Sequence, residues 1–256
     1  MSGKFQHQKI IMRFVAALGL ALCLGACTAA NLPKAQTPDL KVLFVGNSFT
    51  YYNNSLHNHV RRLVRSANDG KAGGKMRALT LSGARLEEHL PGFEGRLVGT
   101  EWDWVVLQGH SREAYDGDVS GFMSTVDRMA NTVNAQGAKT ALFMTWAYTG
   151  EPEMTGVIST NYRLAGSRSG APVVPVGLAF DRAGKQAPEI SLRTSDRLHP
   201  TLAGTYLAAC VFYSWFYTQS SVGLEYAAGL DPTVAATLQK IASDTVNAFA
   251  ALPAQN

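Results

Sequence analysis

The 256-residue chain has 23 Lys and Arg against 19 Asp and Glu, a formal net charge of +4, and only three cysteines. Three of the basic residues fall within the first 13 positions. The remainder carries a net charge of +1, so a nucleic-acid partner is not indicated. Only one of the three cysteines, Cys210, lies outside the N-terminal segment, so no cysteine metal cluster is expected.

Residues 1–26 read as a targeting segment rather than as part of the fold. Lys4, Lys9 and Arg13 form a basic start, and Ile10 to Leu24 is an apolar run too short for a typical membrane span. The run ends in "LGAC", which resembles a bacterial lipoprotein signal cleaved before Cys27, with a lipid then added to the Cys27 thiol. An ordinary secretory peptide cut near "ACTAA" is the alternative. The lipoprotein interpretation predicts a membrane anchor in the bacterial cell envelope, on the periplasmic side of the outer membrane in a Gram-negative host.

Residues 27–40 are polar and non-periodic and carry two prolines, which indicates a tether. Residues 41–256 then form one domain, because the length suits one well-filled core and is short for two. Cys23 would leave with the signal and Cys27 would be lipidated. The remaining Cys210 could form no intramolecular disulfide and is expected to be a small buried hydrophobe.

The domain alternates between two kinds of segment. Short apolar runs predict strands, and amphipathic stretches between and after them predict helices. This alternation favours an α/β fold, with helices on both faces of a five-stranded parallel sheet. The predicted strands are 41–46, 77–82, 104–108, 139–146 and 172–177, and the predicted helices are 54–68, 119–136, 154–168, 201–218 and a last one after Asp231.

Polar or special residues follow four of these strands. Ligands of such sheets bind beyond the carboxyl ends of the strands, so we expect these residues to lie near a site. "GNS" could also be a plain strand-to-helix turn, since Gly, Asn and Ser are common turn residues. The residues at the strand ends are Ser48, Gly83, Gln108 and Trp146.

"SDRLHP" supplies the groups that a serine nucleophile needs. The hydroxyl requires a base, and the base requires an orienting group. Asp196 and His199 lie three residues apart in one predicted loop, so the carboxylate can meet Nδ1 of the histidine and leave Nε2 for Ser48. The backbone N–H groups of Ser48 and Gly83 are candidate donors to an oxyanion.

These motifs resemble the SGNH or GDSL-like serine hydrolases. "FVGNSFT" resembles the first block of that family, "LSGARL" the second and "SDRLHPTLAGTYLAA" the last, and the branch with "GNSFT" and "VVLQ" is the most similar. The resemblance implies a flavodoxin-like three-layer α/β/α fold. It also implies that Ser48 is the nucleophile, His199 the base and Asp196 its partner.

The third block departs from the family. Its usual Gly-x-Asn provides a side-chain amide to the oxyanion, but here the strand ends in "WVVLQGHS". Gln108 has the same NH₂ chemistry on a longer arm and is the predicted substitute, with His110 and Ser111 as alternatives.

The resemblance predicts a serine esterase for short acyl groups, with acetyl esters on envelope or dietary glycans as the favoured substrates and no metal or cofactor. A non-catalytic acyl- or glycan-binding protein and an O-acyltransferase with the same triad remain alternatives. Weaker predictions concern side chains that could contact substrate. Tyr51 and Tyr52 could line the rim of the site, and Trp146 could stack on a sugar ring unless it packs in the core. The weak substrate-binding set is Asn47, Tyr51, His110 and Trp146.

Overall fold

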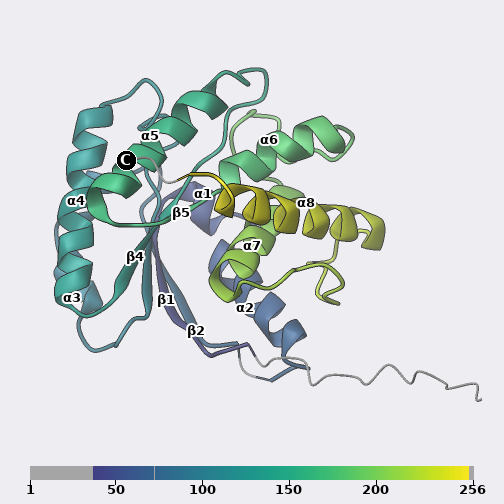
Figure 1. Cartoon of the computed structure of the whole chain (residues 1–256), viewed down its shortest axis with the longest axis horizontal. Coiled ribbons are helices and arrows are strands. Elements are labelled where there is room, and N and C mark those ends of the chain that lie inside the picture. Colours follow the sequence, from purple (N-terminus) through teal and green to yellow (C-terminus); the bar gives the residue numbers. More distant parts are fainter. Residues whose placement is uncertain (1–36, 72, 254–256) are drawn as a thin grey trace, which may run out of the picture. The chain divides into compact units, whose positions relative to one another are not determined.

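The structure is a computed structural model that describes residues 37–71 and 73–253 (Figure 1). The predicted signal peptide (1–26), Cys27 and the tether up to residue 36 lie outside the described residues. The last part of the predicted tether belongs to the domain. Thr37 is buried, its N–H donates to Asn68 Oδ1 at 2.9 Å, and Asn68 Nδ2 returns a bond to Thr37 O at 3.0 Å. Thr37, assigned to the tether, is therefore attached to the domain, and the rest of the predicted tether boundary stays a prediction.

A five-stranded parallel sheet forms the centre of the domain, in the order β2-β1-β3-β4-β5. This confirms the predicted α/β class and strand number. The fifth strand is shorter than predicted, because Pro175 ends it and caps the helix that follows. The strands are β1 (Lys41–Gly46), β2 (Lys75–Thr80), β3 (Trp104–Leu107), β4 (Lys139–Phe143) and β5 (Val173–Val174).

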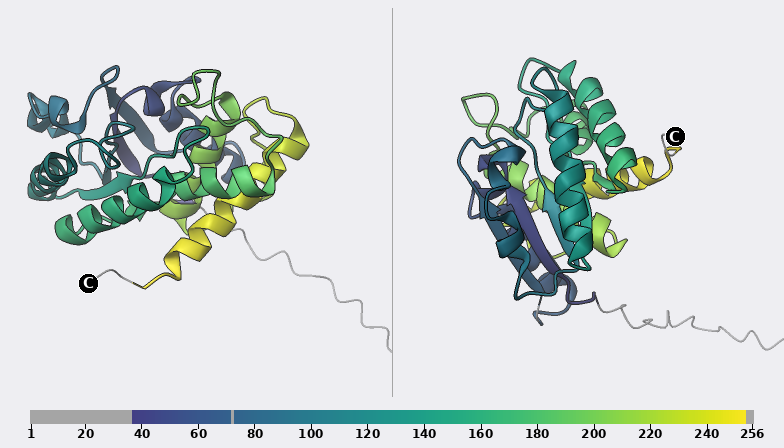
Figure 2. Two further views of the ribbon diagram at one scale, coloured as in Figure 1. Left: turned by 90° about the horizontal axis from the view of Figure 1, so that it is seen from above. Right: turned by 90° about the vertical axis from the view of Figure 1, so that its left-hand side faces the viewer.

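Helices cover both faces of the sheet (Figure 2). The predicted helices correspond to α2 (Leu56–Ala67), α4 (Val119–Ala135), α5 (Met154–Ser169), α7 (Leu202–Tyr217) and α8 (Pro232–Ala250). Four others were not predicted, because three are only four or five residues long and the fourth begins inside an apolar run assigned to a strand. These are α1 (Ser48–Tyr51), η1 (Leu86–His89), α3 (Phe93–Leu97) and α6 (Val176–Gln186).

β1 shows why the sheet needs cover on both faces. Val42 and Phe44 point into a core shared with α2, α6, α7 and α8, whereas Leu43 and Val45 point into a second core shared with α3, α4 and α5. All four side chains are at most 4% exposed. A strand buried on both faces is an uninterrupted apolar run, and such a strand can expose polar groups only where it ends.

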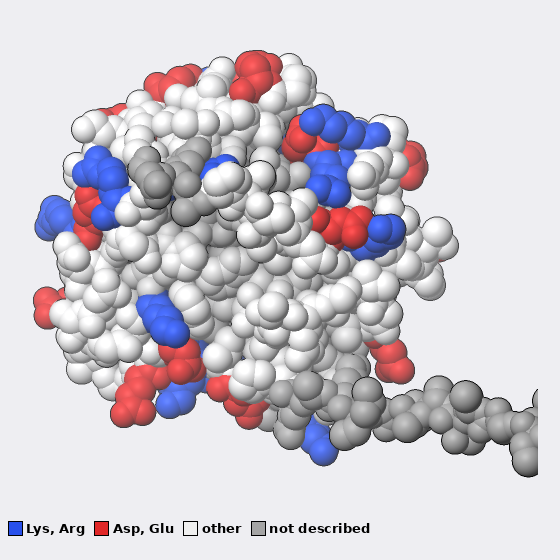
Figure 3. All heavy atoms as spheres, viewed as in Figure 1, with Lys and Arg blue, Asp and Glu red and all other residues white. Residues whose placement is uncertain are grey.

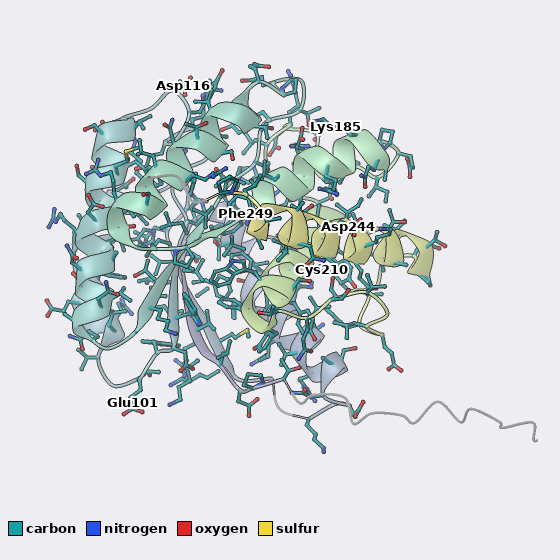
Figure 4. The ribbon with its side chains drawn as sticks, in the orientation of Figure 1. Glu101, Asp116, Lys185, Cys210, Asp244 and Phe249 are labelled. Carbon is teal, nitrogen blue, oxygen red and sulfur yellow. The ribbon has the colours of Figure 1, made fainter. Side chains whose placement is uncertain are left out.

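α7 is buried on almost every side, between the sheet and α8. Cys210 lies within it (Figure 4), and burial raises the pKa of its thiol to about 12. This confirms the prediction that Cys210 is a small buried hydrophobe, since a thiol with that pKa stays protonated near neutral pH.

No helix within residues 37–71 and 73–253 is long and apolar enough to cross a membrane. On the face shown in Figure 3, basic and acidic side chains are interspersed rather than separated into areas of one charge.

Candidate active site

The turn after β1 presents Ser48 at the carboxyl edge of the sheet. Asn47 caps α1: its side-chain Oδ1 accepts from Phe49 N at 3.1 Å, and its backbone carbonyl accepts from Thr50 N at 3.0 Å. Ser48 is thereby the first residue of a short helix. Its own N–H donates to no other described residue and is left free at the helix start.

Gln108 supports this turn from below and is not placed to serve as the predicted oxyanion donor. It is 1% exposed, and Nε2 donates to Asn47 Oδ1 at 2.9 Å and to the Gly109 carbonyl. Its Oε1 accepts from Asn47 N at 3.0 Å and from Thr50 Oγ1 at 2.9 Å. Because both of its N–H groups are used inside the protein, the prediction for Gln108 is corrected to a structural role.

The same packing defines the roles of Asn47, predicted to contact substrate, and of Gly46. Asn47 is 2% exposed and its Nδ2 donates to Ala84 O at 3.0 Å, so it holds the turn and is not free to contact substrate. Gly46 has to be glycine, since a Cβ there would lie 2.4 Å from Gln108 Oε1.

The Asp–His segment folds into a loop around its own carboxylate. Asp196 Oδ1 accepts hydrogen bonds from the N–H groups of Leu198 and His199, both at 2.9 Å, and from the Thr194 hydroxyl at 2.7 Å. Arg197 completes the tight turn with a left-handed backbone, φ 72°. The spacing of three residues therefore lets the carboxylate bind the start of the loop and the histidine ring at once.

The loop places the three predicted residues in one hydrogen-bonded line. His199 Nδ1 lies 2.6 Å from Asp196 Oδ2, and His199 Nε2 lies 2.8 Å from Ser48 Oγ. An ionised carboxylate accepts only, so Nδ1 carries the proton and Nε2 is free to accept the serine hydroxyl hydrogen. This is the geometry that a histidine needs in order to take a proton from the serine.

Hydrogen bonding keeps Asp196 ionised. Desolvation alone would raise the pKa of its carboxyl group. The Leu198 and His199 N–H groups, the Thr194 hydroxyl and the His199 ring outweigh that effect, so the pKa of Asp196 lies well below its usual range.

Trp146 lies beneath the hydrogen-bonded line of Ser48, His199 and Asp196 rather than on the surface. It is 1% exposed and stacks between Phe49 and Phe180, with ring centroids 4.2 and 4.1 Å away. Its indole N–H donates to Leu198 O at 3.0 Å. The proposed sugar platform is therefore wrong for Trp146, which joins the residue after the nucleophile to the residue before the histidine.

A second exposed turn faces the nucleophile turn from the end of β2. Tyr51 OH lies 3.1 Å from Ser82 Oγ, and Asn47 Nδ2 holds Ala84 O, so the turn is fixed on both sides. Gly83, between them, has φ 66° and open space at its Cβ position, and its N–H donates to no described residue. The geometry of Gly83 is compatible with its predicted role as an oxyanion donor. Tyr51, which was predicted to line the rim of the site, lies at this turn.

His110 stays a prediction for substrate contact. Its backbone N–H donates to Glu113 Oε2 at 2.7 Å. Desolvation and the nearby Arg85 lower the pKa of its ring, with Glu88 opposing them, so the ring is neutral at neutral pH. Within the described part of the chain no group of three or more His, Cys, Asp or Glu side chains is arranged to hold a metal ion.

Glu113 is a buried carboxyl within the segment that joins β3 to α4, and it gives a prediction about stability. Burial raises its pKa, although hydrogen bonds from His110 N and Leu86 N act against this. A raised folded-state pKa means that stability falls as pH rises from the unfolded value through the folded one. We therefore expect the free energy of unfolding of Glu113→Gln to fall less than that of wild type as the pH rises above about 4.5.

The measurement is urea denaturation at a series of pH values, with the exposed Glu94→Gln as the control. Parallel curves for wild type and Glu113→Gln would contradict the prediction.

Comparisons with known proteins agree with this architecture. No family model and no curated protein matches the chain, but solved structures do. A protein assigned as an SGNH hydrolase from Slackia heliotrinireducens is 26% identical, with a TM-score of 0.59 over 69% of this chain and 98% of that one. A DUF4886 family protein from Bacteroides uniformis is 19% identical, with a TM-score of 0.66 over 85% of this chain and 98% of that one.

An acetylxylan esterase from Geobacillus stearothermophilus is 16% identical, with a TM-score of 0.55 over 69% of this chain and 94% of that one. A GDSL-like lipase from Parabacteroides merdae also has this fold. The domain therefore has the SGNH hydrolase fold, and the resemblance to the SGNH and GDSL hydrolases is confirmed.

Proposed function

We propose that the protein is a serine esterase that hydrolyses short-chain acyl esters, acetyl esters above all. The observation that carries the proposal is the 2.8 Å contact between Ser48 Oγ and His199 Nε2, in line with the 2.6 Å contact between His199 Nδ1 and Asp196. The similarity to SGNH hydrolases and to esterases supports it.

The reaction would proceed in two steps. Ser48 Oγ attacks the ester carbonyl while His199 Nε2 takes its proton, and the N–H groups of Ser48 and Gly83 hold the oxyanion. The C–O bond to the alcohol then breaks and His199 returns the proton to the leaving oxygen. Water, deprotonated by the same histidine, then attacks the acyl carbonyl. The bond to Ser48 Oγ breaks, His199 returns the proton to Oγ, and the carboxylic acid leaves.

We propose acetylated glycans as the natural substrates. Two of the similar structures belong to acetylxylan esterases, and this similarity supports an acetyl group on a sugar hydroxyl. The test is hydrolysis of p-nitrophenyl acetate, butyrate and octanoate, together with acetate release from acetylated xylo-oligosaccharides. A fluorophosphonate probe, which needs an activated serine, should label the full chain once.

The outcomes separate the possible functions. Turnover that falls with acyl length, together with single labelling, supports the esterase. A folded protein that neither labels nor turns over any ester contradicts it and favours a binding protein. Product formed on an added alcohol rather than on water would identify an acyltransferase.

We also propose that the enzyme works from the cell envelope, anchored by a lipid on Cys27, as "LGAC" suggests. In a bacterial host, we expect the wild-type chain to enter the detergent phase on Triton X-114 partition and to incorporate labelled palmitate. Cys27→Ser should do neither. Equal partition of the two proteins would contradict the anchor.

A further inference from the structure

The segment directly after α1 has an unusual backbone. Asn53, Asn54 and Ser55 have φ values of 51°, 69° and 67°, three consecutive residues in the left-handed region without a glycine. Asn enters this region more easily than other side chains, but a run of three is rare. Such strain persists only where surrounding contacts impose it, and it gathers at functional sites.

Asn53 shows which contacts impose it. Its Nδ2 donates to Pro200 O at 2.8 Å and to Thr205 Oγ1 at 2.9 Å, and its own carbonyl lies 2.6 Å from His59 Nε2. Pro200 directly follows His199. The strained turn therefore ties the end of the nucleophile helix to the residue next to the base.

Tyr52, the C-cap residue directly after α1, contacts the base itself. Its ring lies parallel to the His199 imidazole, with centroids 4.4 Å apart and planes 8° apart, and its backbone N–H donates to Ser48 O at 3.0 Å. Phe49 meets the imidazole edge-on at 5.9 Å. The helix that carries the nucleophile thus also presents two rings to the histidine.

Asp196 is the only polar restraint on the imidazole from its own loop. Its hydrogen bond to Nδ1 opposes rotation of the ring, but it is a single contact to a side chain that is 43% exposed. Rotation about the histidine χ2 bond would carry Nε2 away from Ser48. A flat ring stacked at 4.4 Å opposes that rotation, because tilting the imidazole would break the face-to-face contact.

We propose that Tyr52 and Asn53 are positioning residues for His199. Tyr52 sets the plane of the imidazole, and Asn53 sets the position of the loop that carries it, so that Nε2 faces Ser48 Oγ. This inference rests on the proposed esterase function. It assigns to Tyr52 and Asn53 a share in orienting His199, beside the hydrogen bond from Asp196.

Variants of Tyr52 separate the ring from its hydroxyl. Tyr52→Phe keeps the flat ring and should retain kcat within about twofold, whereas Tyr52→Leu should lower kcat about 10- to 100-fold with KM changed less than about threefold. A loss in KM rather than kcat, or equal losses in Phe and Leu variants, would overturn the role of the ring and indicate substrate contact.

Variants of the strained turn separate the side chain from the backbone. Asn53→Gly allows the same φ without strain and deletes both donated bonds, so kcat should fall about tenfold. Asn54→Gly relaxes the neighbouring position, whose side chain is exposed, and should leave kcat unchanged. Equal kcat for Asn53→Gly and Asn54→Gly would overturn the role of Asn53.

A spectroscopic measurement keeps this inference separate from the proposed function. The proton on His199 Nδ1, hydrogen-bonded to Asp196, should give a low-field ¹H NMR signal in wild type and Tyr52→Phe. In Tyr52→Leu and Asn53→Gly it should broaden or vanish while the melting temperature and circular dichroism stay native. If wild type hydrolyses no ester but this pattern holds, only the esterase fails. An unchanged signal in all variants would overturn the positioning role.

Discussion

Ser48→Ala is expected to reduce ester hydrolysis to the rate in the absence of enzyme and to abolish labelling by a fluorophosphonate. The loss in kcat should reach at least about 10⁴-fold, since removing the nucleophile of such a triad leaves only the oxyanion donors and binding. The substitution deletes one oxygen whose contact is His199 Nε2, so the turn capped by Asn47 should stay intact. Initial rates with p-nitrophenyl acetate and an unchanged melting temperature would test both points.

Ser124→Ala is the matched control, because Ser124 is an exposed serine on α4. It should keep full activity and labelling. If Ser48→Ala retained more than a small fraction of wild-type kcat, the hydrolysis would have to come from another group, and the proposed mechanism would fail.

Asp196→Asn should lower kcat nearly as much, although it only exchanges one carboxylate oxygen for an NH₂ group. The amide would face His199 Nδ1 with its NH₂ group or lose the contact. The imidazole would then favour the tautomer with its proton on Nε2, which cannot accept from Ser48 Oγ. A change of this kind lowers kcat about 10⁴-fold with little effect on KM. Steady-state kinetics of the full chain would measure both constants.

Asp244→Asn is the control for Asp196→Asn. Asp244 lies on α8 (Figure 4), where it forms an exposed pair with Lys240, and its loss should not alter turnover. A loss of folded protein in Asp196→Asn, with the kcat of the folded fraction preserved, would show that the carboxylate only stabilises the loop.

The strand pattern could be predicted because its cause is local. β1 is buried on both faces, so "VLFV" carries no polar residue and the change at "GNS" marks where the strand ends. The same reasoning failed for β5 and α6, where one apolar run served first as a strand of two residues and then as a helix. Hydrophobicity does not distinguish these outcomes over so short a stretch.

The same distinction applies to the residues of the site: local pattern identified some of them, and only the fold showed the roles of others. Residue type and spacing pointed to Ser48, Asp196 and His199, because Asp and His three apart can bind each other within one loop. Gln108, Asn47 and Trp146 were placed at the right edge of the sheet but given the wrong tasks. Their amide and indole groups are used up by buried partners far away in the sequence, which no local pattern reveals.

The sequence by itself determined the α/β class, the five strands and the three residues of the Ser–His–Asp line. The class and the strands depend on periodicity, and the three residues were marked by a strand end and by the Asp–His spacing within one loop, whereas the fold brings His199 to Ser48. Only the tertiary structure decided which polar groups remain free at the site. The N–H groups of Ser48 and Gly83 are open, whereas Gln108 is enclosed, and Tyr52 lies flat against a histidine 147 positions later in the chain. Burial and long-range packing set these outcomes, because a polar group removed from water must find a partner wherever the fold provides one.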